Sequence, residues 1–334
     1  MDTADLSRRA LLAFVSTLLA SGCAGGMPAS RSDPLPSWSE GPARDRIMAF
    51  VREVTDPSSA AYVPMGERLA VFDNDGTLWC EQPIYVQAAF IADRIREQAS
   101  SHPEWSTREP FRAVLAGDRA ALAAGGERTL MELVMATHAG MTVEGFSGIA
   151  ARWIAEARHP RFGRRYTELV YSPMIELMRW LRGLGFGTAI VTGGGVEFVR
   201  TFSLPVYGVA REHVVGSSIR TRYQADAPGP RLMREAEIDF IDDKAGKPVG
   251  IHRQFGMKPI AAFGNSDGDY EMLEWTTSGT GARLGMIVHH DDAEREYAYD
   301  RRSAVGRLDR ALDDAASRGW LVASMRRDWR RVFA

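Results

Sequence analysis

Cysteine is scarce in this chain, which has only Cys23 and Cys80 among its 334 residues. A scaffold held together by several disulfides is therefore excluded. An excess of basic residues is also missing, because 41 Lys and Arg are offset by 43 Asp and Glu, for a formal net charge of -2. A nucleic-acid-binding surface would need a basic excess, so we expect no nucleic-acid partner. Charged residues at 25% and apolar residues at 45% are ordinary for a globular protein.

The apolar stretch from Ala10 to Ala20 is too short for a permanent membrane-spanning helix. It follows the paired Arg8 and Arg9 and suits the apolar part of an export signal. We interpret residues 1–23 as a signal that resembles the twin-arginine type, with an ordinary secretory signal as the alternative. The end of this segment, at Cys23, resembles a lipoprotein processing site. We therefore expect an exported, periplasmic protein, either membrane-anchored through a lipidated Cys23 or cleaved without lipidation.

Composition and periodicity divide the remaining chain. Residues 24–42 are rich in Gly, Pro, Ser and Ala, which is typical of a flexible tether. Residues 83–170 show helical periodicity, so we expect a helical cap inserted into a core formed by residues 43–82 and 171–334. Apolar runs in the core predict strands at 69–72, 187–191, 260–263 and 284–288, with hairpins within 213–243. This alternation predicts an α/β fold with a doubly wound, mostly parallel sheet, whose site lies beyond the carboxyl ends of the strands.

Two carboxylates follow the first predicted strand of the core. Asp73 and Asp75 come directly after the apolar run that ends at Phe72, and Gly76 and Thr77 follow them. Residues two apart on a strand share a face, so both carboxylates would lie at one spot. Like charges this close are costly unless a cation lies between them. The pair therefore predicts a hard divalent cation, most plausibly Mg²⁺, that acts on a phosphate.

Two more elements suit a phosphate. Thr192 ends a predicted strand and is followed by Gly193 and Gly194, so its hydroxyl and the exposed N–H groups can hold phosphate oxygens. A lysine is needed to offset the negative charge of phosphate and nucleophile. Lys244 and Lys258 are also in range, but Lys247 begins a helical run and would face the cleft. We therefore assign this role to Lys247.

These motifs resemble the set found in the haloacid dehalogenase superfamily of phosphatases, whose first motif is Asp-x-Asp-x-Thr. The fourth motif of that superfamily, Gly-Asp-x-x-x-Asp, matches the run after Phe263, except that Asn265 replaces the first aspartate. The resemblance implies metal ligation by Asp73, Asp75, Asn265 and Asp269. Asp267 is an alternative ligand, either directly or through water, because an amide brings no charge.

The resemblance is strongest to the phosphoserine phosphatase branch and covers about residues 65 to 290. It implies that Asp73 is the nucleophile that forms an aspartyl-phosphate, that Asp75 is the general acid and base, and that Thr192 and Lys247 stabilise the phosphoryl group. Glu81 lies near the position where that branch holds the amine of its substrate, so we include it with Thr192, Gly193 and Gly194 among the substrate-binding candidates.

We therefore expect an Mg²⁺-dependent phosphomonoester hydrolase that acts on small phosphorylated metabolites. A phosphotransferase with the same intermediate and a non-catalytic phosphate- or ligand-binding lipoprotein are the alternatives. Cys80 has no histidine close to it in sequence, so we do not expect it to be a nucleophile. The sequence leaves the physiological substrate and the oligomeric state open.

Overall fold

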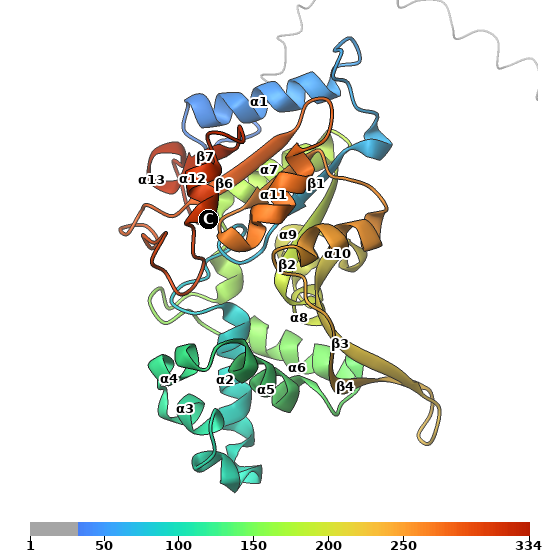
Figure 1. Ribbon diagram of the computed structural model, residues 1–334, viewed down its shortest axis with the longest axis vertical. Helices are drawn as coiled ribbons and strands as arrows, with labels where there is room; N and C mark the ends of the chain where they lie inside the picture. The colour runs from blue at the N-terminus through green and yellow to red at the C-terminus, as the bar shows by residue number, and fades with distance from the viewer. Residues whose placement is uncertain (1–32) are drawn as a thin grey trace, which may run out of the picture. The chain divides into compact units, whose positions relative to one another are not determined.

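In the computed structural model, which describes residues 33–334, seven strands form one sheet in the order β4-β3-β2-β1-β5-β6-β7 (Figure 1). The strands are β1 Leu69–Phe72, β2 Gly187–Gly195, β3 Val214–Gln224, β4 Arg231–Phe240, β5 Ala261–Gly264, β6 Leu284–His289 and β7 Leu321–Ser324. Neighbouring strands are parallel throughout this sheet, except that β3 and β4 form an antiparallel hairpin. The predicted α/β fold with a mostly parallel sheet is confirmed.

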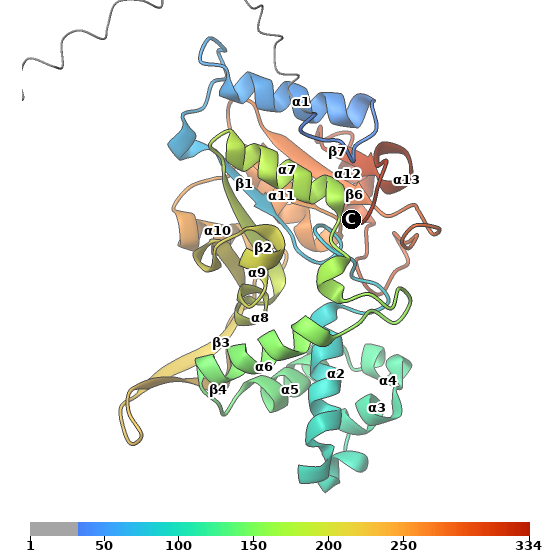
Figure 2. The same ribbon diagram turned by 180° about the vertical axis from the view of Figure 1, so that it is seen from behind.

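Helices connect these strands. Their bounds are α1 Pro42–Thr55, α2 Val86–Gln98, α3 Phe111–Ala116, α4 Arg119–Ala124, α5 Gly126–His138, α6 Val143–Glu156, α7 Ser172–Gly183, α8 Val196–Arg200, α9 Ser203–Tyr207, α10 Gly246–Phe255, α11 Tyr270–Thr277, α12 Arg310–Asp314 and α13 Met325–Asp328. In the two opposite views, α1 and α7 lie on one face of the sheet, and α10 and α11 lie on the other (Figures 1 and 2). The sheet is therefore doubly wound.

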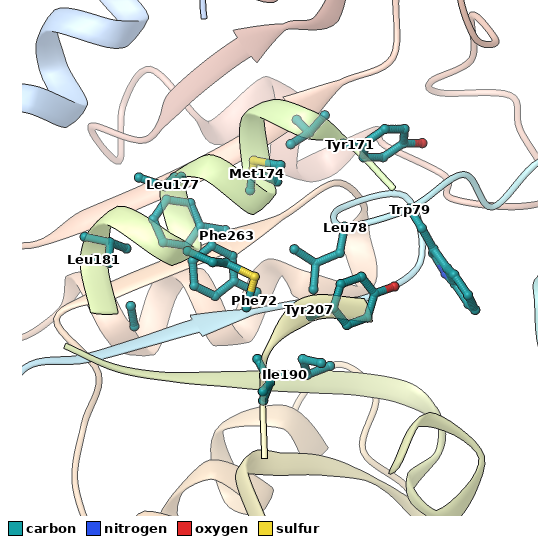
Figure 3. Close-up of a cluster of buried hydrophobic side chains, with 14 of the residues drawn as sticks. Phe72, Leu78, Trp79, Tyr171, Met174, Leu177, Leu181, Ile190, Tyr207 and Phe263 are labelled. Carbon is teal, nitrogen blue, oxygen red and sulfur yellow. The ribbon is translucent and has the colours of Figure 1, made fainter. Parts of the chain in front are cut away.

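The residues of strand β1 show why helices pack on both faces of the sheet. Its four residues are all buried, and successive side chains point to opposite faces. Ala70 and Phe72 join the apolar cluster under α1 and α7, whereas Leu69 and Val71 join the cluster under α10 and α11. Phe72 stacks on Phe263 of β5, with ring centroids 4.4 Å apart (Figure 3). Burial of each large apolar side chain contributes about 1.5–3 kcal/mol, so this strand is held firmly at the centre of the sheet.

Helices α2 to α6 are inserted between β1 and α7 and lie together beyond the sheet (Figure 2). Helices α2, α3 and α5 share an apolar core of their own, which consists of Ile91, Ile95, Trp105, Phe111, Val114 and Leu133. The buried residues of α6 belong to the cluster that also contains Phe72. The described part of the chain from Pro34 to Ala334 nevertheless forms one compact unit. The division into a core and a cap at residues 83 and 170 therefore stays a prediction.

The β3–β4 hairpin reaches from the sheet to these inserted helices. The Gly140 N–H donates to the Arg234 carbonyl, and the Arg234 N–H donates to the Met141 carbonyl, each over 2.9 Å. The Arg234 guanidinium lies over the Phe146 ring, 4.1 Å from its centroid. The hairpin therefore forms one wall of the space between the sheet and α5.

The segment before α1 is packed against the sheet domain. Leu35 and Trp38 are fully buried, and Trp38 Nε1 donates to the Pro173 carbonyl over 3.0 Å. The sequence predicts a flexible tether at residues 24–42 from their Gly, Pro, Ser and Ala content, and within the described part of that range Leu35 and Trp38 are instead packed into the core. The predicted export signal at 1–23, with Cys23, lies outside the described residues. Between residues 33 and 334, no helix has both the length and the apolar character needed to cross a membrane.

Candidate active site

Three polar loops meet at the carboxyl ends of the central strands. Strand β1 pairs with β2 on one side and with β5 on the other, and Phe72 is in register with both Ile190 and Phe263. Asp73 follows Phe72 directly, Thr192 comes two residues after Ile190, and Asn265 comes two residues after Phe263. The parallel register therefore brings the loops that carry the predicted site residues to one edge of the sheet.

Lys247 joins two of these loops from the first turn of α10. Its Nζ lies 2.6 Å from Asp73 Oδ1, 2.6 Å from Asp269 Oδ1 and 3.1 Å from the Val191 carbonyl. Burial by itself would lower the pKa of this lysine, but the charges of Asp269 and Asp73 outweigh burial and raise it. The side chain is therefore a fixed positive charge beside Asp73, as the assigned role requires. Lys258 bonds instead to Ser278 Oγ, at 3.1 Å.

Asp73 and Asp75 are both held in poorly solvated positions. Burial, followed by the charge of Asp269, raises the pKa of Asp73 to about 8, although Lys247 opposes this shift. Burial also raises the pKa of Asp75, whose Oδ1 accepts a hydrogen bond from Trp79 Nε1 over 2.9 Å. A raised pKa favours the protonated carboxyl group that a general acid needs.

The loop after Asp75 needs glycine at position 76. Gly76 has φ +75°, and a Cβ there would lie 2.0 Å from Asn265 Nδ2. The close approach fixes Asn265, whose Nδ2 donates to Glu81 Oε1 over 2.8 Å and whose Oδ1 accepts from Thr77 Oγ1 over 3.1 Å. The amide is thereby oriented, and its oxygen lies on the side of the aspartate loop.

The two aspartates of the fourth motif have different roles in the structure. Asp269 Oδ1 accepts from Lys247, and its Oδ2 accepts from the N–H groups of Asn265 and Ser266 over 2.9 and 3.0 Å. Asp267 turns toward the start of α12, where its Oδ1 accepts from the N–H groups of Asp309 and Ala311 over 3.0 and 2.9 Å. The structure therefore does not place Asp267 as a substitute for the missing aspartate.

The chemistry of the donors can be compared with the needs of a divalent cation. Within residues 33–334, no cluster of three or more His, Cys, Asp or Glu side chains is arranged to hold a metal ion. Both carboxylate oxygens of Asp269 are engaged, Oδ1 by Lys247 and Oδ2 by backbone N–H groups, which leaves oxygen donors from Asp73, Asp75 and Asn265. Oxygen donors suit Mg²⁺, and a cation would offset the cost of the two buried carboxylates, which otherwise favour their neutral forms. The residues present fit Mg²⁺ with this smaller donor set.

The glycine turn, formed by Gly193, Gly194 and Gly195 at the carboxyl end of β2, is tied to the inserted helices by a contact that the sequence did not reveal. Thr192 Oγ1 accepts from the Gly194 N–H over 3.0 Å, and the Gly195 N–H donates to Gln87 Oε1 over 2.7 Å. Gln87 Nε2 lies 3.1 Å from Nε2 of His138 on α5. Gln87 is more than a hundred residues from Gly195, and no local motif marks it.

A cavity of about 490 Å³ opens on this arrangement. Asp73, Asp75, Thr192, Gly193 and Lys247 line one end of it, and residues from α2, α5 and the β3–β4 hairpin line the rest. The volume is in the range of small-molecule sites. The predicted catalytic residues therefore border one cavity together with the predicted phosphate-binding residues Thr192, Gly193 and Gly194.

Glu81 also borders the cavity, but its carboxylate is already engaged. Its Oε1 accepts from both Asn265 Nδ2 and Tyr299 OH, the latter over 2.7 Å. Burial raises its pKa well above the usual value. A neutral carboxyl group with these partners is a poor anchor for a cationic amine, so the role suggested for Glu81 by the resemblance gains no support from the geometry.

Asp242 is a buried carboxylate that the sequence did not single out. It follows the β3–β4 hairpin and packs against Gly250, where a Cβ would lie 2.4 Å from Asp242 Oδ1. In the described part of the chain, neither of its carboxylate oxygens has a hydrogen-bond partner of standard geometry. Burial raises its pKa to about 7, against the opposing effect of Lys247 and the Thr192 N–H.

Cys80 is close to a histidine in space, although not in sequence. Its Sγ lies 3.7 Å from His159 Nε2, which also lies 2.6 Å from the Gln82 carbonyl. Because a carbonyl can only accept, this nitrogen carries a proton and cannot act as a base toward the thiol. Burial raises the pKa of Cys80. The geometry agrees with the expectation that Cys80 is not a nucleophile.

Comparison with known proteins identifies the family. The model of the haloacid dehalogenase-like hydrolases matches residues 70–274, which is more than half of the chain. The protein therefore belongs to the haloacid dehalogenase-like hydrolase family, as the resemblance of its motifs indicated. No curated protein matches the chain.

Several solved structures are similar to this chain. A protein of unknown function from Bordetella pertussis Tohama I is 15% identical, with a TM-score of 0.50 over 77% of this chain and 97% of that one. A functionally unknown protein from Anaerococcus prevotii DSM 20548 is 17% identical, with a TM-score of 0.49 over 74% of this chain and 85% of that one. A phosphoserine phosphohydrolase-like protein from Francisella tularensis subsp. tularensis SCHU S4 is 14% identical, with a TM-score of 0.38 over 75% of this chain and 98% of that one.

Proposed function

We propose that this protein is a phosphomonoester hydrolase that acts through an aspartyl-phosphate on Asp73. One observation carries the proposal: Lys247 bridges Asp73 and Asp269, and Asp73 faces the same cavity as Thr192 and the glycine turn. A nucleophilic carboxylate, a fixed cation and a set of N–H and hydroxyl donors are the groups that phosphoryl transfer needs. The substrates would be small phosphorylated molecules that fit the cavity.

In the first step, an Asp73 oxygen attacks phosphorus in line and the ester P–O bond breaks. Asp75 gives its proton to the departing alcohol oxygen. In the second step, Asp75 takes a proton from water as the water oxygen attacks phosphorus and releases Asp73. Lys247 and Thr192 hold the phosphoryl oxygens throughout. Mg²⁺, held by Asp73, Asp75 and Asn265, would neutralise the charge of the phosphoryl group.

The first experiment is turnover of phenyl phosphate by the purified full-length protein with Mg²⁺. We expect activity that is lost on chelation and restored by Mg²⁺. Asp73→Asn should lower kcat by about a thousandfold or more, because the amide is not a nucleophile. Asp56→Asn, a change at an exposed surface carboxylate, is the matched control and should leave kcat unchanged. Acid-quenched wild-type protein should carry one phosphate on Asp73 by mass spectrometry.

Two outcomes would favour the other readings of the site. Formation of a new phosphate ester when an alcohol is added would indicate a phosphotransferase. Absence of turnover for every phosphomonoester, together with measurable binding of inorganic phosphate, would indicate a binding protein, which the neutral Asn265 in place of an aspartate favours.

We also propose that the protein is exported by residues 1–23 and anchored through Cys23. The support is the paired arginines, the short apolar stretch and the cysteine that follows it. Cell fractionation tests this proposal: the wild-type protein should be found with membranes, and Cys23→Ala should move it to the soluble periplasmic fraction. Recovery of both from the cytoplasm would contradict export.

A further inference from the structure

The cavity at the active site extends well beyond the groups that act on phosphate, and its far part is mainly apolar. Residues of the inserted helices and of the β3–β4 hairpin line this part. The apolar residues that line this part are Ile91, Leu130, Met131 and Val134 on the helices, and Ile219 and Ile238 on the hairpin. The two isoleucines are paired across β3 and β4, so their side chains share one face of the hairpin.

The polar side chains that the hairpin and its neighbours present to the cavity form contacts with other protein groups. Ser217 Oγ donates to the Gly193 carbonyl, and Ser218 Oγ donates to Asp239 Oδ2, each over 2.8 Å. Arg234 Nε donates to the His138 carbonyl over 2.8 Å, and its guanidinium lies 3.2 Å from Glu197 Oε2. The positive charge of Arg234 is therefore paired with the negative charge of Glu197, while its Nη1 makes no hydrogen bond of standard geometry within the described residues.

His138, at the back of the cavity, is held in its neutral form. The Thr137 hydroxyl donates to the Leu133 carbonyl over 2.8 Å, so it must accept from His138 Nδ1, which lies 2.7 Å away. Nε2 is then the acceptor for the Gln87 amide. Burial, followed by the charges of Arg234 and Arg94, lowers the pKa of His138 to about 3. This histidine offers no charge to a ligand.

The remaining charges are grouped at the phosphoryl end. Asp243 is exposed there, and a Cβ on Gly193 or Gly268 would lie 3.8 or 2.8 Å from its Oδ1. This carboxylate disfavours a second anionic group on the substrate. Farther into the cavity, a charged group would lose its hydration without gaining an unpaired opposite charge, whereas an apolar group would gain by leaving water.

We infer that the site accepts phosphomonoesters whose leaving group is an uncharged, mainly apolar alcohol or phenol. The inference rests on the proposed hydrolase function and names the substrate class for the same site. Such a leaving group fills the apolar part of the cavity while its phosphoryl group lies between Asp73, Lys247 and Thr192. Phosphoserine and sugar phosphates, which carry charges or many hydroxyls, do not match this wall.

The test compares kcat/KM for benzyl phosphate, phosphoserine and glucose 6-phosphate with Mg²⁺. All three are esters of primary alcohols, so the comparison reports recognition more than intrinsic reactivity. We expect benzyl phosphate to be preferred by about tenfold or more, the range that hydrophobic pockets give. Leu130→Asn, at the rim of the cavity, should lower kcat/KM for benzyl phosphate about fivefold and leave the other two esters within about twofold.

Leu204→Asn is the matched control. Leu204 lies on α9 and is 59% exposed, compared with 49% for Leu130, but it does not line the cavity. We expect no change in any of the three values. Equal or faster turnover of phosphoserine or glucose 6-phosphate, or no effect of Leu130→Asn, would overturn the inference and leave the hydrolase function intact. Absence of turnover for all three esters would overturn both.

Discussion

Asn265 Nδ2 donates to Glu81 Oε1 over 2.8 Å, and the Tyr299 hydroxyl donates to the same oxygen over 2.7 Å. Both Asn265 and Glu81 are buried at 1% exposure, so neither bond can be replaced by bulk water. Glu81 therefore orients the amide that stands where the family motif has an aspartate. Glu81 is therefore a positioning residue for Asn265.

Glu81→Gln should be tolerated, because a side-chain amide oxygen can accept from both donors and resembles the neutral form that burial favours. We expect kcat/KM for benzyl phosphate and for phosphoserine to change by the same small factor. Glu81→Leu should lower the free energy of unfolding by about 1–3 kcal/mol for each donor left unpaired. Urea unfolding and the two kinetic constants are the measurements. A selective loss of phosphoserine turnover in Glu81→Gln would show instead that Glu81 binds the amine.

Lys247→Met should abolish activity and destabilise the fold. The change leaves Asp73 and Asp269 buried without the cation that now lies 2.6 Å from each. Removing one partner of a buried ion pair costs about 3–5 kcal/mol, which denaturant unfolding would detect. Lys258→Met is the control, since that lysine contacts Ser278 and the Trp275 ring away from the site. If Lys247→Met lowered the free energy of unfolding by less than about 1 kcal/mol, the buried ion pairs of Lys247 with Asp73 and Asp269 would be contradicted.

Asp242→Asn should stabilise the protein at alkaline pH. The pKa of Asp242 is about 7 in the folded protein and near 3.8 in the unfolded chain, so the folded state holds the proton more tightly. The contribution of Asp242 to the free energy of unfolding therefore falls as the pH rises from about 4 to 7, at about 1.4 kcal/mol for each pH unit. The variant should lack this contribution. At pH 8 its free energy of unfolding should exceed that of the wild type by a few kcal/mol. Parallel curves for the two proteins across this range would refute the assignment.

His138 should stay neutral throughout the physiological range. Its pKa is lowered to about 3 from the usual 6.5, so the unfolded chain binds its proton first. The contribution of His138 to stability is thus present above pH 6.5 and is lost as the pH falls toward 3. NMR of the imidazole ring should show no titration between pH 5 and 8. A midpoint near 6.5 would mean that His138 can bring a charge to the cavity and would weaken the argument for apolar leaving groups.

The sheet and its polar edge were predictable because their signals are local. The apolar run before Asp73 and the glycines after Thr192 lie within a few residues of the groups they position. Lys247 was assigned from its place at the start of a helix. In each case, a few consecutive residues determine where the strand ends or the helix begins.

The wall of the cavity could not be predicted in the same way. Gln87 and His138 acquire their roles from bonds between elements far apart in the sequence, and Arg234 reaches both α5 and α8 from the hairpin. Asp267 shows the opposite case, because a motif position suggested a metal ligand and the loop before α12 takes the carboxylate instead. Tertiary packing decides such roles, and a single sequence does not record it.

The two backbone bonds between the hairpin and the 140–141 loop have a mechanical consequence. If the inserted helices swing outward to admit a substrate, they must either break these bonds or carry the tip of the hairpin with them. The pairing of β3 with β4 shifts register between Ser218 and Thr221, and an irregular ladder bends more easily than a regular one. In such a motion, the bending of the sheet edge would be concentrated at that irregularity.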